Sequence, residues 1–262
     1  GQSILEFLRN AGSYRPVRTR KVDFLTFPEF DYSRTRLIDD QMGYQWDRVV
    51  VFVEDPQLFV VFDIFKSRTE GYFTLANLWH TRLILDRGNH WYDTVYDRIG
   101  QHTLPRNRRL LILFPHTHYR LEGVEDQKRH YHDELLIHQT TARHFERADI
   151  ETLVTVLVPH DAQQPPPFWV GRVHLVRGEP DRAGMGVRID LPNRRILIGV
   201  KADLRRDIVR DWRRPRYTYE AGRVRFDDLE SNGDFVFLEQ RRERLDYTIV
   251  NLTRALHGRK LL

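Results

Sequence analysis

The sequence contains no cysteine, which excludes thiolate nucleophiles, disulfides, iron–sulfur clusters and zinc sites built from Cys. It has no apolar run near the roughly 18 residues that a membrane-spanning helix needs. It also lacks the N-terminal series of basic, apolar and small residues that marks a signal peptide. Lysine is scarce, with 5 Lys against 37 Arg, and the formal net charge is only +5. This charge does not indicate nucleic-acid binding, which requires a concentrated basic face.

The sequence is instead rich in short β-branched and aromatic runs separated by turn residues. Hydrophobic residues make up 40% and aromatic residues 12% of the chain, which is enough to bury a sizeable core. Residues 47–53 and 58–63 flank a turn cluster that contains Pro56, and they predict a hairpin of two buried strands. Further strands are predicted over residues 71–80, 109–115, 151–159, 168–177, 186–191, 195–201, 216–220, 223–227, 235–239 and 247–252.

This rhythm of strands and turns favours stacked sheets over βαβ units. We therefore expect an all-β protein, a large antiparallel β-sandwich of about a dozen or more strands, in one domain over residues 1–262. Helices should be few and short, with one candidate at 203–212, while residues 3–10 predict either one helical turn or a strand. The proline run at 163–167 predicts a stiff loop at a sheet edge, because proline cannot donate to a ladder.

In the first third of the chain, a strand ending in Arg precedes a strand ending in Asp, and a Gly-Tyr step then leads into an aromatic strand. The residues concerned are Ser3-Ile4-Leu5-Glu6-Phe7, Tyr32-Ser33-Arg34-Thr35-Arg36, Gly43-Tyr44-Gln45-Trp46-Asp47-Arg48, Phe59-Val60-Val61-Phe62-Asp63, and Gly71-Tyr72-Phe73 leading into Leu78-Trp79-His80. This pattern resembles the C-terminal β-sandwich domain of heparinase II/III-like polysaccharide lyases. The match is strongest over residues 1–80, and the remainder resembles that domain only in being rich in strands.

The resemblance implies a lyase in which an N-terminal helical toroid packs on the sandwich and which cuts uronic-acid polysaccharides by β-elimination. It places the catalytic Tyr, with an Asn or His that neutralises the uronate, on the helical part. Because this sequence has no helical region, we expect the chain to be the sandwich part of a larger protein and to be inactive without the helical domain. The implied partners are an acidic polysaccharide and that helical domain, and the implied location is periplasmic or extracellular.

The resemblance also places candidate ligands on the strand that ends in Trp79 and His80. His80 is the candidate catalytic residue, in contact with a metal or a carboxylate, and Trp79 would stack on a sugar face. Aromatic and guanidinium groups suit an anionic sugar. The candidate substrate-binding residues are Arg34, Arg36, Tyr44, Arg48 and Trp79. A structural alternative is a core Trp beside an edge His, with Arg48 paired to Asp63 across the hairpin.

A metal-like pattern is formed by His116, His118 and Glu122. Two His residues two apart on a strand share a face, and a Glu four residues later can complete the set. The pattern resembles the first half of a cupin metal motif, so a divalent metal such as zinc is the candidate cofactor. The second half of that motif is not apparent, and Arg120 and Arg129 would repel a cation. The structural alternative is a polar strand end followed by a loop.

Three functions therefore stay open. The first is the sandwich part of a lyase acting on an acidic glycan. The second is a non-catalytic carbohydrate-binding or scaffold sandwich, and the third is a cupin-like metal enzyme. The sequence contains no Gly-x-Ser-x-Gly element for acyl transfer and no glycine-rich phosphate loop. The arginine clusters at 205–216 and 241–244 are interrupted by acidic residues and predict solvated faces.

Overall fold

The computed structural model describes residues 19–99, 102–115, 120–129, 132–161, 166–204, 222–242, 244–251, 255–258 and 260–261. Within these ranges the chain forms 22 strands and one short helix, α2 (Pro167–Val170). Every strand pairing in this part of the chain is antiparallel. The predicted all-β, antiparallel class is therefore confirmed.

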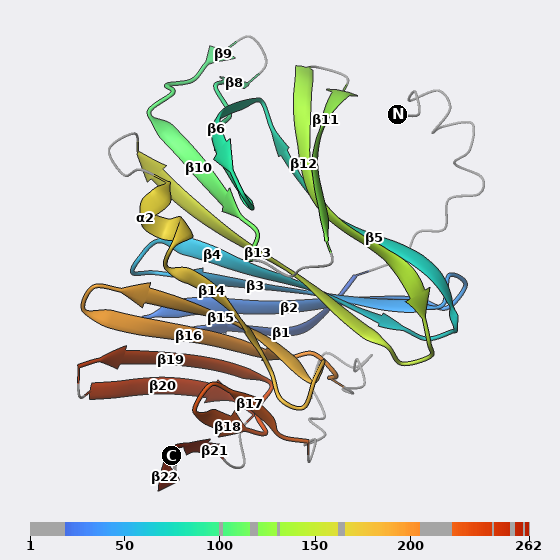
Figure 1. Cartoon of the computed structure of the whole chain (residues 1–262), viewed down its shortest axis with the longest axis vertical. Helices are drawn as coiled ribbons and strands as arrows, with labels where there is room; N and C mark the ends of the chain where they lie inside the picture. The colour runs from blue at the N-terminus through green and yellow to red at the C-terminus, as the bar shows by residue number, and fades with distance from the viewer. Residues whose placement is uncertain are drawn as a thin grey trace.

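An eight-stranded sheet, called here the central sheet, forms the middle of the molecule (Figure 1). Its strands lie in the order β1 (Arg20–Thr26), β2 (Phe30–Asp39), β3 (Tyr44–Val53), β4 (Leu58–Ser67), β13 (Ile150–Asp161), β10 (Arg108–Leu113), β7 (Trp91–Val95) and β6 (Leu83–Gly88). The hairpin predicted around Pro56 is confirmed as β3 paired with β4.

Three further sheets accompany the central sheet, and a two-stranded ribbon of β8 (Arg98–Ile99) and β9 (His102–Thr103) completes the set. The outer sheet has the order β11 (Leu121–Arg129), β12 (His132–Phe145) and β5 (Gly71–Thr81). The five-stranded sheet has the order β14 (Val173–Arg177), β15 (Gly184–Leu191), β16 (Arg194–Lys201), β19 (Phe235–Arg241) and β20 (Arg244–Val250). The small sheet has the order β17 (Val224–Phe226), β18 (Leu229–Ser231), β21 (Ala255–His257) and β22 (Lys260–Leu261).

The main core lies between the central and five-stranded sheets. Alternate residues of β4, such as Phe62, meet residues of the facing sheet such as Ile198 and Phe235, and all three side chains are fully buried. Phe30 stacks on Phe237 across the same interface, with ring centroids 4.5 Å apart. Because neighbouring residues of a strand point to opposite faces, this core takes only half of the apolar residues of β4.

The other half of the apolar residues of β4 and β13 packs under the outer sheet. Phe65 and Leu153 of the central sheet contact Leu75 and Phe145 of the outer sheet. The central sheet is thus covered on both faces, which explains why β4 is apolar nearly throughout. The far face of the five-stranded sheet is covered in turn by the small sheet, through Leu197, Leu238 and Phe226 among others.

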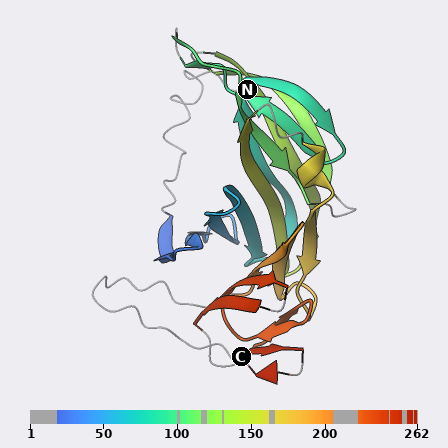
Figure 2. The same cartoon turned by 90° about the vertical axis from the view of Figure 1, so that its left-hand side faces the viewer.

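The layers follow one another along the long axis of the molecule. The ribbon β8–β9 and one end of β11 and β12 lie at one end, and β21 and β22 lie at the other (Figure 1). The view turned by 90° shows the same order, with the green strands at the top and the red strands at the bottom (Figure 2). No described helix has the length and apolar character that crossing a membrane requires.

Some local predictions differ from the structure. The predicted strand at 168–177 is wrong in its first part, because α2 occupies Pro167–Val170 and β14 begins only at Val173. Pro167 stands in the first turn of α2, where a missing N–H removes no helical hydrogen bond. The predicted strand at 216–220, residues 205–212 of the predicted helix and residues 3–10 lie outside the described residues. The single domain over residues 1–262 stays a prediction.

Candidate functional site

His80 lies near the end of β5, where it shares a buried carboxylate with a tyrosine. The Nδ1 atom of His80 is 3.3 Å from Oε2 of Glu134, and the hydroxyl of Tyr96 donates to Oε1 of the same residue at 2.7 Å. The Glu134 side chain is 9% exposed. The pairing of β5 with β12 sets this geometry, because His80 lies opposite Leu136 and Glu134 lies two residues away on the same face.

This group carries side chains suited to proton transfer. A carboxylate close to one imidazole nitrogen favours one orientation of the ring, and imidazole is a common proton-transfer group near neutral pH. Two arginines pair with Asp97, the residue after Tyr96. Arg82, two residues after His80, is 3.6 Å from Asp97, and Nη2 of Arg106 is 2.8 Å from the same carboxylate. The group at Glu134 therefore combines an imidazole and a phenol, and the neighbouring Asp97 carries two guanidinium groups.

Trp79 does not share that surface. Its indole faces the central sheet, where Nε1 donates to Oγ1 of Thr155 at 3.2 Å and the ring packs against the cluster that contains Ile112 and Ile137. His80 points the opposite way, because consecutive residues of a strand alternate between faces. Trp79 therefore lies on the inner face of the outer sheet, and His80 lies on its outer face.

The four remaining candidates for substrate binding are divided between the two faces of the central sheet. Arg34 and Arg36 point toward the five-stranded sheet, are 0% and 2% exposed, and both form ion pairs with Asp47. Nη1 of Arg34 also donates to the Lys201 carbonyl at 2.8 Å. These two guanidinium groups join the central sheet to the end of β16.

Tyr44 and Arg48 lie on the opposite face of the central sheet. The ring of Tyr44 stacks on Phe65 with centroids 5.9 Å apart. Arg48 is 47% exposed and donates from Nε to Oδ1 of Asp63 at 2.7 Å. The cross-strand pair proposed as the structural alternative for Arg48 is thus present. The indole N–H of Trp46 donates to the same carboxylate at 2.9 Å, so Asp63 accepts hydrogen bonds from two side chains.

The metal-like pattern is only partly described. His116 and His118 lie outside the described residues. The Glu122 carboxylate forms an ion pair with Nδ1 of His90. Among the residues that the structure describes, no group of three or more His, Asp or Glu side chains is arranged to hold a metal ion.

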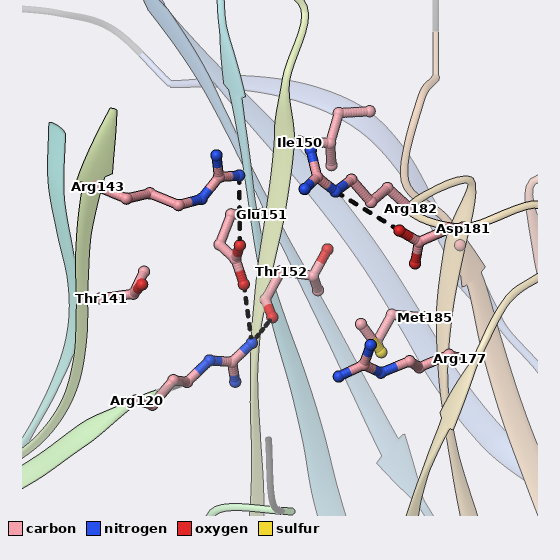
Figure 3. Close-up of a pocket in the computed structure, with 11 residues that line it drawn as sticks. Arg120, Thr141, Arg143, Ile150, Glu151, Thr152, Arg177, Asp181, Arg182 and Met185 are labelled. Atoms are coloured by element: carbon pink, nitrogen blue, oxygen red, sulfur yellow. Dashed lines mark hydrogen bonds and ion pairs between the residues drawn. The ribbon is translucent and has the colours of Figure 1, made fainter. Parts of the chain in front are cut away.

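A pocket of about 250 Å³ lies where the outer, central and five-stranded sheets meet (Figure 3). Arg120 and Arg143 enter it from the outer sheet, and Arg177 and Arg182 enter it from the β14–β15 side (Figure 3). Its remaining lining residues are Thr141, Ile150, Glu151, Thr152, Asp181, Gly184 and Met185. Four guanidinium groups thus face two carboxylates in this lining.

Arg120 is the most deeply buried of these four arginines, with a side chain 5% exposed. It donates to the Gln139 amide oxygen at 3.0 Å, to Glu151 at 3.2 Å and to the Thr152 carbonyl. Its Nε atom is buried without a hydrogen-bond acceptor among the described residues. Burial and the nearby charge of Arg177 lower the pKa of Arg120, and Glu151 offsets this only in part.

Asp149 lies next to the pocket and forms ion pairs with the two arginines at the rim of the pocket. Arg143 and Arg182 each lie 3.0 Å from one of its carboxylate oxygens. Burial alone would raise the pKa of Asp149, but the hydrogen bonds from Arg143 and the Glu146 backbone, with the charges of both arginines, lower it overall. No sequence motif indicates this site, because its arginines come from three separate segments of the chain, near residues 120, 143 and 177–182.

No protein-family model matches the sequence, and no curated protein matches it significantly. Among solved structures, heparan sulfate lyase HepC from Pedobacter heparinus aligns with a TM-score of 0.50 and 13% identity, over 71% of this chain and 28% of that chain. A mutant of the same enzyme gives a TM-score of 0.50 and 14% identity over the same shares of both chains. The chain therefore has a heparinase-like β-sandwich fold, as the sequence resemblance predicted, and it spans about 28% of the length of those enzyme chains.

Proposed function

We propose that this chain is the β-sandwich part of a polysaccharide lyase that cleaves an acidic, uronic-acid-containing glycan by β-elimination. The observation that carries the proposal is the placement of His80 and Tyr96 on the buried carboxylate of Glu134. The heparinase-like fold supports the same assignment. The proposal includes a helical domain elsewhere in the full-length protein, and a periplasmic or extracellular location.

In this proposal, the sandwich and the helical domain each contribute groups to the reaction. β-Elimination requires a group that neutralises the uronate carboxylate, a base that removes the adjacent proton and an acid that protonates the leaving oxygen. In this proposal His80 contacts the substrate at the face of the sandwich and exchanges a proton with it. Glu134 orients the imidazole, and the helical domain supplies the remaining groups. The isolated chain is then expected to give no turnover.

The test is a lyase assay on the full-length protein that contains this chain. Heparan sulfate, chondroitin sulfate, alginate and pectin are offered in turn, and the ultraviolet absorbance of the unsaturated uronate product is followed. We expect product from at least one polymer and a loss of about 100-fold or more in kcat for His80→Ala, the usual contribution of a proton-transfer group. Absence of product from every polymer would overturn the lyase assignment.

A matched control is His174→Ala. His174 lies on β14, 41% exposed and 3.4 Å from Asp190, so it pairs with a carboxylate as His80 does but on another sheet. It should keep full activity. Equal losses in both variants would argue against a specific role for His80, and steady product formation by the isolated chain would contradict the need for a helical domain.

The alternative functions give different results in the same experiments. A carbohydrate-binding or scaffold sandwich would retain the glycan without forming the unsaturated product. A cupin-like enzyme would carry zinc, iron or manganese, and a content below about one atom per ten chains in elemental analysis would exclude a tightly held metal.

A further inference from the structure

The arginine pocket lies at the far end of β12 from the His80 group. Glu134 stands near the start of that strand, whereas Thr141 and Arg143 stand near its end. The pocket therefore belongs to a separate region of the sandwich surface. None of its four arginines is used in the proposed elimination chemistry.

We propose that this pocket binds the anionic group, a sulfate ester or a carboxylate, of an acidic sugar. The anion site itself rests on the pocket alone, and the choice of a sugar as the ligand rests on the proposed function. Binding here would fix a sugar residue of the glycan without taking part in bond cleavage.

The first argument is the uneven charge of the lining. Four guanidinium groups line the pocket, and they face three carboxylates: those of Glu151 and Asp181 in the lining, and that of Asp149 beside it, which pairs with Arg143 and Arg182. Arg177 has no ion pair or hydrogen bond with any described residue, and Figure 3 shows its guanidinium directed into the pocket. A guanidinium group in this position can donate two parallel hydrogen bonds to an oxyanion.

The second argument is an unmet donor deep in the pocket wall. The side chain of Arg120 is only 5% exposed, and its Nε has no hydrogen-bond acceptor among the described residues. Nη2 of Arg143 is likewise buried without a hydrogen bond and lies 3.6 Å from the nearest Glu151 oxygen. Buried donors without acceptors are costly, and an anionic ligand would offset that cost.

The third argument is the volume of the pocket and the apolar part of its lining. About 250 Å³ is below the roughly 300–1,000 Å³ of pockets that take drug-sized ligands, so the space suits a single sugar residue with its charged substituent. Ile150 and Met185 add apolar surface for the C–H face of a sugar ring. Arg120 is held by Gln139, Glu151 and Thr152, so the deepest guanidinium is already fixed before a ligand arrives.

The test is calorimetric titration of the chain at low ionic strength with four probes: glucosamine 6-sulfate, glucuronate, inorganic sulfate and uncharged glucosamine derivatives such as N-acetylglucosamine. We expect saturable binding of the sulfated sugar or of glucuronate, and no binding of the uncharged sugar. Arg177→Ala should weaken the binding about tenfold or more, the usual effect of losing one charge-assisted hydrogen bond. Added salt should weaken the binding as well.

The matched control is Arg244→Ala on β20, since Arg244 is also exposed and lies on another edge of the molecule. It should bind the probes as the unchanged protein does. Failure of both acidic sugars to bind, or equal binding by Arg177→Ala, would overturn the proposal. Binding of inorganic sulfate alone would overturn the assignment to a sugar. These titrations do not measure product, so their failure and the failure of the lyase assay are distinguishable.

Discussion

Arg34 and Asp47 form an ion pair of 2.6 Å in which both side chains are completely buried. Arg36 completes the group, because its Nε lies 2.6 Å from the other oxygen of Asp47. Burial alone would raise the pKa of Asp47, but the charge of Arg34 and the hydrogen bonds and charge of Arg36 lower it overall. The two arginines are thus stabilised by one carboxylate and by main-chain carbonyls at the end of β16.

Asp47→Ala should therefore destabilise the fold by about 3–5 kcal/mol, the usual result of leaving a buried charge uncompensated. Chemical denaturation of the two proteins measures this difference. Asp246→Ala is the control, because Asp246 pairs with Arg244 at the surface and its side chain is 43% exposed. The control should change the free energy of unfolding by less than about 1 kcal/mol. Equal effects would show that Asp47 has no special structural role.

Arg48→Ala tests the cross-strand pair on the opposite face of the sheet. Among the described residues, the variant leaves the buried carboxylate of Asp63 with the indole N–H of Trp46 as its one side-chain donor, so we expect a loss of about 1–3 kcal/mol. Arg68→Ala removes a similar pair with Asp40, but there both side chains are largely exposed, and the loss should stay below about 1 kcal/mol. If Arg48→Ala unfolds at the same denaturant concentration as the unchanged protein, the pair contributes nothing to stability.

Gly184 should tolerate no side chain. A Cβ at this position would lie 2.7 Å from the ring of Phe226 and 2.9 Å from the Val200 carbonyl oxygen, and the backbone carbonyl cannot move aside easily. Gly184→Ala is expected to lower the free energy of unfolding by about 1–3 kcal/mol, the usual effect of overpacking. Gly171→Ala, where a Cβ would meet nothing within 4 Å, should be neutral or slightly stabilising. A thermal unfolding scan of both variants decides the matter.

The sequence predicted β3, β4, β10 and β13 of the central sheet and, at least in part, the strands of the five-stranded sheet, because these strands are dense in β-branched and aromatic residues and end at turn residues. Among the strands that it missed are β1, β6 and β7 of the central sheet and β11 and β12 of the outer sheet. The strands β1, β6 and β11 lie at sheet edges, where the apolar pattern is weak, whereas β12 lies inside its sheet but mixes polar and apolar residues. The aromatic pair Phe168-Trp169 imitated a strand, but the prolines before it begin a helical turn instead.

The candidate sites depend on strand register, which the sequence does not specify alone. Arg34 lies opposite Val49, so the even-numbered residues of β2 share a face with the odd-numbered residues of β3. Arg34 and Arg36 are therefore separated from Tyr44 and Arg48, although all four are even-numbered. The arginine pocket was missed for a related reason, since its residues come from three sheets and only the fold brings them together.

Because of the ion pairs of Asp149, the free energy of unfolding should depend on pH. The pKa of this carboxyl is lowered in the folded chain, so its contribution is fully present above the unfolded value of about 3.9 and is lost as the pH falls through the folded value. The difference in unfolding free energy between the unchanged protein and Asp149→Asn should hence be largest near neutral pH and shrink below about pH 4.

Urea denaturation at a series of pH values measures that difference directly. Asp181→Asn is the appropriate comparison, because its carboxylate is 75% exposed and lies 3.7 Å from Arg182, too far for a strong hydrogen bond. Its effect on the free energy of unfolding should stay below about 1 kcal/mol. A difference for Asp149→Asn that stays constant from neutral to strongly acidic solution would mean that Arg143 and Arg182 do not stabilise the charged form of Asp149.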